Sequence, residues 1–148
     1  MTDTDPDLLA RLEHYYDEVP RASADPQEHG PFTIFVSRGG WPYYARPTLG
    51  LTAEVTPDQV TSVLDRLEEL GVPRSIEWVH ETTPGLRAAA TAAGLEVGDY
   101  PLLVLEGDPV ERQSPVVVRR MAAADEDLAA VQGAVHVGFG QDLSLIHI

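Results

Sequence analysis

The chain has 148 residues, 43% of them hydrophobic, which is enough for one good core and too short for two full domains. Ten arginines and no lysine stand against 24 acidic residues, and the resulting formal net charge of −14 argues against nucleic-acid and membrane partners. The absence of cysteine excludes disulfides, thiol nucleophiles and zinc–thiolate sites.

The start of the chain, MTDTDPD at residues 1–7, is acidic, whereas a secretory signal needs a basic start and an apolar run. No apolar stretch reaches the roughly 18 residues that a membrane span requires. We therefore expect a cytoplasmic protein.

The first predicted element is a helix. Asp5 and Pro6 fit an N-cap and a first helical position, and apolar residues then recur at helical spacing as far as Val19. Pro20 is expected to end this helix. Residues 20–31 are polar and contain proline and glycine, which predicts a loop.

A hairpin is predicted next. The run Phe32–Ser37 is apolar and β-branched, and a glycine pair after Arg38 separates it from the segment WPYYARP at residues 41–47. Pro42 and Pro47 lack an N–H group, so they restrict the second strand to a sheet edge or to few residues.

A second helix has the clearest local signal in the chain. Thr56 fits the N-cap, Pro57 the first helical position, and Gln59 completes a capping box. An apolar stripe from Val60 to Leu70 follows, and the glycine and proline at 71 and 73 end the helix.

Three further elements are predicted before residue 107. Ile76–Val79 is typical of a short strand, and residues 84–93 of a helix capped by Thr83 and closed by Gly94. The uninterrupted apolar run Pro101–Leu105 is typical of a central strand.

The fold class predicted from this order is α/β, with an α+β mixed sheet. After residue 107, Val116–Val118 predicts a strand and the apolar positions between Leu128 and Val135 predict a helix. The expected organisation is a first domain at 1–107, a linker at 108–114, the start of a second, incomplete domain at 115–142, and an anomalous tail at 143–148.

The order strand, helix, strand, helix, strand from Tyr43 to Leu105 resembles the later half of the GCN5-related N-acetyltransferase (GNAT) fold. The segment TPGLRAAATAAGL at residues 83–95 is similar to the family's helix Asn-x-x-Ala-x-x-x-Tyr-x-x-x-Gly-Phe. Gly94 matches this pattern, whereas Ala90 stands in place of the tyrosine that often protonates the departing CoA thiolate. Leucine at 95, leucine at 86 and threonine at 83 replace the phenylalanine, alanine and asparagine.

The segment VVVRRMAAADEDLAAVQGAVHVGFG at residues 116–140 resembles the family's opening strand and first helix. This second resemblance implies the N-terminal part of a tandem-GNAT actinobacterial protein, truncated within its second domain. The first domain is then a degenerate GNAT-like acyltransferase fold.

The family binds acetyl-CoA through Gln/Arg-x-x-Gly-x-Gly/Ala between a strand and a helix, where backbone N–H groups hold the pyrophosphate. The equivalent stretch here is ARPTLGLTAEVTPDQ, residues 45–59. The spacing from Arg46 to Gly50 is one residue too long, Thr52 stands near the second small position, and the helix starts several residues late at Thr56. Acetyl-CoA is thus the cofactor that the resemblance implies, and we expect this fragment not to bind it.

Two groups of residues are candidates for a substrate pocket. His80 and Glu81 lie at the end of the strand predicted at 76–79, where open α/β sheets bind ligands, and Trp78 precedes them. The alternative is a strand terminus with polar residues leaving the sheet, since neighbouring strand residues point to opposite faces. The second group lies beside the glycine turn and forms either an aromatic wall or hairpin packing: Trp41, Tyr43 and Tyr44.

The five histidines have no spacing suited to a metal site. The resemblance implies acetyl transfer to a small-molecule amine acceptor, and it leaves a homodimer open. Since no catalytic residue can be assigned, we expect a non-catalytic part of an N-acetyltransferase. The alternative is a small-ligand-binding or dimerisation module with a GNAT-like fold.

Overall fold

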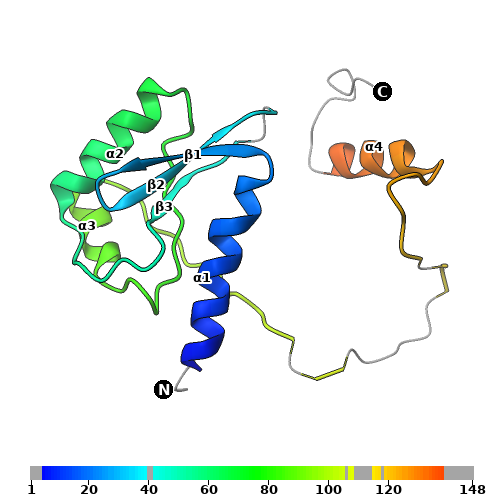
Figure 1. Ribbon diagram of the computed structural model, residues 1–148, viewed down its shortest axis with the longest axis horizontal. Coiled ribbons are helices and arrows are strands. Elements are labelled where there is room, and N and C mark those ends of the chain that lie inside the picture. Colours follow the sequence, from blue (N-terminus) through cyan, green and yellow to red (C-terminus); the bar gives the residue numbers. More distant parts are fainter. Residues whose placement is uncertain (1–4, 40–41, 106, 109–114, 118, 139–148) are drawn as a thin grey trace. The chain divides into compact units, whose positions relative to one another are not determined.

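The computed structural model describes residues 5–39, 42–105, 107–108, 115–117 and 119–138. These residues form a mixed α/β structure with a three-stranded antiparallel sheet of order β1-β2-β3 and four helices (Figure 1). The elements in chain order are α1 (Pro6–Arg21), β1 (Ala24–His29), β2 (Phe32–Ser37), β3 (Ala45–Pro47), α2 (Pro57–Glu69), α3 (Leu86–Ala92) and α4 (Leu128–Gly138). The chain divides into two compact units, Met1–Pro101 and Leu102–Ile148.

Helix α1 begins as predicted, because the Asp5 side chain accepts a hydrogen bond of 3.0 Å from the backbone N–H of Asp7. Its predicted end at Pro20 is wrong by one residue, since the helix runs to Arg21. The missing N–H of Pro20 falls in the last turn, and a bidentate pair between Arg21 and Asp17, at 2.9 and 3.0 Å, closes that turn.

The loop predicted for residues 20–31 is wrong, because Ala24–His29 forms strand β1. It pairs antiparallel with β2 in a register that runs from Ala24 opposite Ser37 to His29 opposite Phe32. The strand is polar because it lies at the sheet edge, and Pro26 is tolerated there for the same reason. Gly30 adopts φ +58° in the turn, a conformation that favours glycine.

The predicted hairpin is confirmed with a shorter second strand than the sequence indicated. Strand β3 covers Ala45–Pro47 and pairs antiparallel with β2 in the register Ile34–Ala45, Thr33–Arg46 and Phe32–Pro47. Pro42 lies outside the strand, as its missing N–H group leads one to expect.

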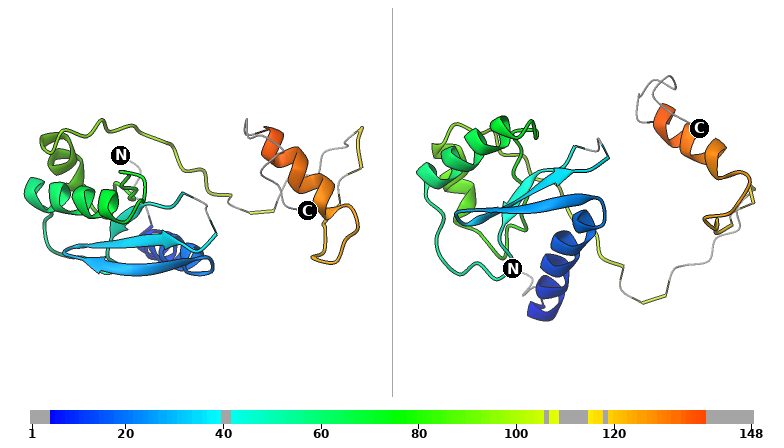
Figure 2. Two further views of the ribbon diagram at one scale, coloured as in Figure 1. Left: turned by 90° about the horizontal axis from the view of Figure 1, so that it is seen from above. Right: turned by 45° about the horizontal axis from the view of Figure 1, so that its top comes forward.

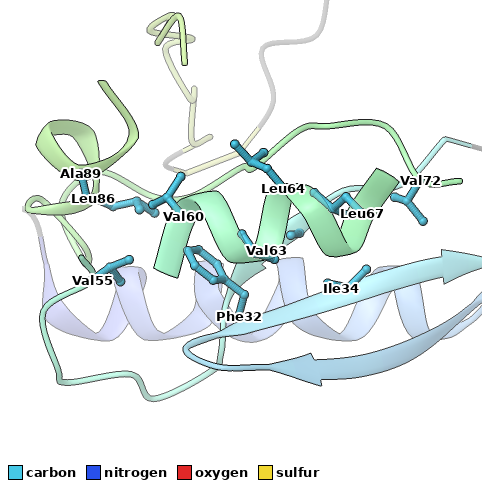
Figure 3. Packing of buried hydrophobic residues seen from close by; sticks show 11 residues of the cluster. Phe32, Ile34, Val55, Val60, Val63, Leu64, Leu67, Val72, Leu86 and Ala89 are labelled. Atoms are coloured by element: carbon cyan, nitrogen blue, oxygen red, sulfur yellow. The ribbon is translucent and has the colours of Figure 1, made fainter. Parts of the chain in front are cut away.

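The capping box of α2 is confirmed. The hydroxyl of Thr56 accepts from the Gln59 backbone N–H at 3.3 Å, and the Gln59 side-chain oxygen accepts from the Thr56 N–H at 2.9 Å. The apolar stripe of α2 packs against the sheet residues Phe32 and Ile34 (Figure 3). Residues from α3 complete this core, which comprises Phe32, Ile34, Ala45, Val55, Val60, Val63, Leu64, Leu67, Val72, Leu86 and Ala89.

The sheet has helices on both faces (Figures 1 and 2). We call the side that carries Ile34 and Ala45 the α2 face, because these residues join the core around α2. The other side, with Phe35 and Arg46, is the α1 face. The Arg21 guanidinium of α1 lies 5.9 Å from the centre of the Phe35 ring. Strand residues alternate between these two faces.

The strand predicted at residues 76–79 is reduced to one parallel bridge between Ile76 and Ala45. Helix α3 is confirmed within the predicted range 84–93, and Gly94 closes it with φ +87°. The predicted Thr83 cap is wrong, because the N-cap is Gly85 and no side chain caps it.

Two strand predictions are wrong. The run Pro101–Leu105 forms no strand, and the Leu103 side chain is 90% exposed. The described residues of 115–120 form no strand either, whereas residue 118 lies outside the described ranges. Helix α4 confirms the helix predicted from Leu128 to Val135.

Residues 109–114, most of the predicted linker, and the tail at 143–148 lie outside the described ranges, so both stay predictions. Within the part of the chain that the structure describes, none of the helices is both long and apolar enough for a membrane crossing.

Candidate functional site

A buried ion pair joins α1 to the sheet. The Arg46 side chain is only 2% exposed, and its Nη2 atom donates to Oε2 of Glu13 over 2.5 Å. The guanidinium also lies 5.4 Å from the centre of the Tyr16 ring, one helical turn along α1. Side chains of β3 alternate between the two faces of the sheet, and that of Arg46 lies on the α1 face. Because the Arg46 side chain is buried there, its charge needs a partner inside the protein.

The Glu13 carboxylate has a second partner. Its Oε1 atom accepts from the Thr82 hydroxyl at 2.5 Å, and this hydroxyl lies 2.9 Å from the Val79 carbonyl oxygen as well. One carboxylate thus links α1, β3 and the turn before α3, three segments far apart in the sequence. We call Glu13, Arg46 and Thr82 the Glu13 network.

A small cavity of about 110 Å³ lies at this network. Glu13 and Thr82 are part of its wall. Its other walls come from the end of β3, from the loop that follows, and from the turn before α3: Pro47, Thr48, Gly50, Leu51 and Thr83. Hydroxyl and carboxylate oxygens supply the polar part of this lining, and those of Glu13, Thr48 and Thr82 already form hydrogen bonds within the protein.

The side chains beside the network have altered acidity. Burial, with a further contribution from the charge of Glu77, raises the pKa of Tyr44 to about 12, although Arg46 acts in the opposite direction. Partial desolvation also raises the pKa of the Glu77 carboxyl, again opposed by Arg46. Tyr44 is therefore protonated at neutral pH and can act as a hydrogen-bond donor but not as a base.

One polar atom of the network lacks a partner. Among the described residues no acceptor reaches the buried Nε of Arg46, while its Nη2 is paired with Glu13. Both Glu13 oxygens already accept hydrogen bonds from the protein. This arrangement stabilises the packing of α1, and it provides neither a nucleophile nor a free base for catalysis.

The aromatic candidates beside the hairpin pack within the fold. The Tyr43 hydroxyl lies 2.6 Å from Oγ of Ser23. The Tyr44 ring meets the Phe35 ring edge-on, with centroids 6.3 Å apart. Trp41 lies outside the described residues.

The candidates around the predicted strand end lie apart from the cavity. His80 and Glu81 are exposed in the turn after Val79, and neither lines the cavity. Trp78 packs against the core, and its buried Nε1 has no acceptor among the described residues. The described part of the chain holds no cluster of histidine and acidic residues that could bind a metal ion.

Sequence reasoning singled out His80 and Glu81 but missed Glu13 and Thr82. Glu13 looked like one acid among many on a solvated helix face. A usable signal was the arginine at 46, because a charge between alanine and proline in a short, aromatic-flanked strand needs a partner nearby.

The start of α2 stands where the resemblance places the cofactor loop. Pro57 has no N–H group, the Gln59 N–H donates to the Thr56 hydroxyl, and the Val60 N–H donates to the Thr56 carbonyl. Asp58 adds a negative charge to this first turn. Few donors therefore remain there for a pyrophosphate, and the local charge repels one.

Comparison of the sequence and structure with protein-family models, with curated proteins and with solved structures finds no match.

Proposed function

We propose that this chain is the N-terminal portion of an acetyl-CoA-dependent N-acetyltransferase of the GNAT type, in which the first domain, predicted at residues 1–107, is degenerate and non-catalytic. The observation that carries the proposal is the order of β3, α2, the parallel bridge at Ile76, and α3. The resemblance rests on five elements; the first four of them occur in this order, whereas Pro101–Leu105, the fifth, forms no strand. The parallel pairing of Ile76 with Ala45 supports it, because a helix separates the two segments in the chain.

The start of α2 supports the absence of a cofactor grip. A pyrophosphate site at a helix N-terminus needs free N–H groups and no opposing negative charge. Here Thr56 and Gln59 satisfy each other's backbone donors, while Pro57 contributes none. The capping box therefore occupies backbone donors at the start of α2 that a pyrophosphate would need.

The position of the missing general acid supports the same conclusion. Ala90, which aligns with the family's tyrosine, is fully buried in α3. A methyl group there has no proton to give a departing thiolate. Replacing Ala90 by tyrosine in this packed helix is not expected to restore activity, because the larger ring has no space.

Acetyl-CoA tests the proposal at two levels. The 148-residue chain with a panel of amines is expected to release no CoA thiol in a colorimetric thiol assay and to bind no acetyl-CoA by calorimetry. The protein encoded by the whole open reading frame is expected to bind acetyl-CoA and to release CoA thiol when an acceptor amine is present. Turnover by the 148-residue chain, or no binding by the whole protein, would contradict the proposal.

The cavity beside the Glu13 network favours a second candidate function, a non-catalytic module that binds a small ligand. Its lining combines threonine hydroxyls and one carboxylate with apolar side chains, and its volume of about 110 Å³ admits only a few heavy atoms. Small amines and alcohols are the matching probes. Thermal stabilisation by such probes in the 148-residue chain, lost in Thr83→Val, supports this second function, and no stabilisation by any of them excludes it.

A further inference from the structure

Helix α1 covers one face of the sheet with few buried side chains (Figure 2). Asp17 and Pro20 are the buried residues among its sixteen, all of which the structure describes. Helix α2, with thirteen residues, has four buried apolar side chains. Tyr15 and Val19 of α1 are 60% and 48% exposed. Because burial of apolar surface is the main source of stability for a packed helix, α1 is held less strongly than α2.

Polar contacts hold α1 on the sheet. Among the described residues, Glu13 makes the only side-chain hydrogen bonds from α1 to other elements, to Arg46 and Thr82, each 2.5 Å long. At the end of the helix, the Arg38 guanidinium donates to the backbone carbonyl of Arg21 at 3.3 Å. The last turn is thus anchored beside β1, whereas the middle of α1 depends on Glu13.

The Arg46 guanidinium is paired incompletely. Glu13 accepts from Nη2, and the buried Nε has no acceptor among the described residues. Arg21 shows the complete arrangement, since its Nε and Nη2 both donate to the Asp17 carboxylate, at 2.9 and 3.0 Å. The second oxygen of Glu13 accepts from Thr82 instead. A carboxylate that is not attached to α1 can therefore pair with Arg46 more completely than Glu13 does.

We propose that α1 is a detachable lid on the sheet, held closed by Glu13, and that its opening exposes Arg46 as a binding site for an apolar carboxylate. In the closed state Glu13 occupies this site as an internal ligand. Its attachment to the chain gives it a high effective concentration, so a simple carboxylate competes poorly with it. The face that α1 leaves includes the Phe35 ring, which lies beside Arg21 of α1, so a ligand with an apolar group gains a further contact.

The lid is independent of acetyl-CoA, and its failure leaves the proposed acetyltransferase function untouched. It also goes beyond the small-ligand candidate, which concerns the cavity with α1 closed. The residues that carry it all lie in the unit Met1–Pro101.

Native-state hydrogen exchange tests the lid. The protection factors of the α1 amides are expected to be at least about tenfold lower than those of α2, because α1 opens while the rest of the unit stays folded. Leu67→Ala damages the α2 core in the closed and open states alike, so α2 should lose protection on the order of a hundredfold. Protection of α1 should stay within about twofold of the original. Equal protection of the two helices, or an equal loss in Leu67→Ala, overturns the proposal.

Acetate tests the carboxylate site. Glu13→Ala removes one methylene group and the carboxylate, and an acetate ion closely matches the space that they leave. Sodium acetate is expected to raise the melting temperature of Glu13→Ala by at least about 3 °C more than sodium chloride does at equal ionic strength. The original chain should respond equally to the two salts, because Glu13 fills its site.

The double variant Glu13→Ala with Arg46→Met is the matched control, and it should show no preference for acetate. An acetate response in this control, or no difference between the salts in Glu13→Ala, overturns the proposal. Circular dichroism first establishes that Glu13→Ala is folded. If it is unfolded at low salt, its refolding is compared in the two salts: folding in acetate alone supports the site, and equal folding in both or in neither overturns it.

Discussion

The two faces of the sheet are covered in different ways. On the α2 face, Ile34 and Ala45 meet the apolar stripe of α2 in a hydrophobic core, and a polar contact between His29 and Ser62 lies outside it. On the α1 face, the buried Arg46 is held by Glu13 and by the Tyr16 ring. The first face gains stability mainly from the burial of apolar side chains, whereas the second depends on one carboxylate that satisfies a buried charge. The second face should therefore be the more vulnerable to a single substitution.

The largest effect is expected from Glu13→Ala. Its removal leaves the Arg46 guanidinium buried and unpaired, which costs about 3–5 kcal/mol of unfolding free energy. Urea unfolding followed by circular dichroism measures the loss. The double variant Glu13→Ala with Arg46→Met should recover most of it, because no charge then remains without a partner. A loss below about 1 kcal/mol in the single variant would mean that water reaches the guanidinium.

The α2 face is tested by Leu67→Ala. Leu67 is fully buried in the core, and truncation removes apolar contacts and leaves a cavity. The expected loss is about 3 kcal/mol in the same unfolding assay. Leu67→Met keeps the volume and should cost less than about 1.5 kcal/mol. Equal losses of unfolding free energy in Leu67→Met and Leu67→Ala would mean that this contact depends on the shape of the side chain and not on the apolar area it buries.

A smaller loss is expected from Thr56→Ala, which removes the N-cap of α2. The Gln59 backbone N–H then lacks its acceptor, and stability should fall by about 1 kcal/mol. Thr61→Ala is the control, because the Thr61 hydroxyl bonds only to the Pro57 carbonyl within the helix. The control should stay within about 0.5 kcal/mol of the original protein. Equal losses in both variants would argue against the capping box.

The smallest effect on stability at neutral pH is expected from Tyr44→Phe. This variant should differ from the original protein in its stability at alkaline pH. Burial raises the pKa of Tyr44 from 10.0 to about 12, so the folded state holds this proton more tightly than the unfolded state. Stability must then fall as the pH rises from about 10 towards 12. The phenylalanine variant should lose less stability over that range in thermal melts. Tyr43→Phe is the comparison, and equal behaviour of both variants would contradict the assignment.

The fold was predictable wherever a local signal and the tertiary environment agree. Two features of α2 depend only on residues close together in the sequence, and both occur in the structure: the capping box of Thr56 and Gln59, and the apolar stripe. The polar segment Ala24–His29 was missed as a strand, because its pairing with β2 is a backbone interaction that leaves no mark on its side chains. The apolar segment Pro101–Leu105 was misassigned for the converse reason, since a strand also needs a partner edge.

The candidate site was less predictable than the fold. The search of the sequence favoured histidine and aromatic residues, and these turned out to be exposed, as His80 is, or engaged in packing, as Tyr44 is. Glu13 and Thr82 stand 69 positions apart and meet only in the folded chain. No local sequence pattern marks such a pair, because the two side chains interact only after folding has brought them close together.

The sequence by itself determined the helices, the capping of α2, the hairpin at β2 and the apolar stripe that forms the core, because these follow from nearest neighbours and from periodicity. Only the tertiary structure decided that Ala24–His29 joins the sheet, that Arg46 is buried against Glu13, and that Ile76 borders Ala45 in parallel. The physical reason is that burial and pairing depend on what lies opposite a residue, and that partner comes from elsewhere in the chain.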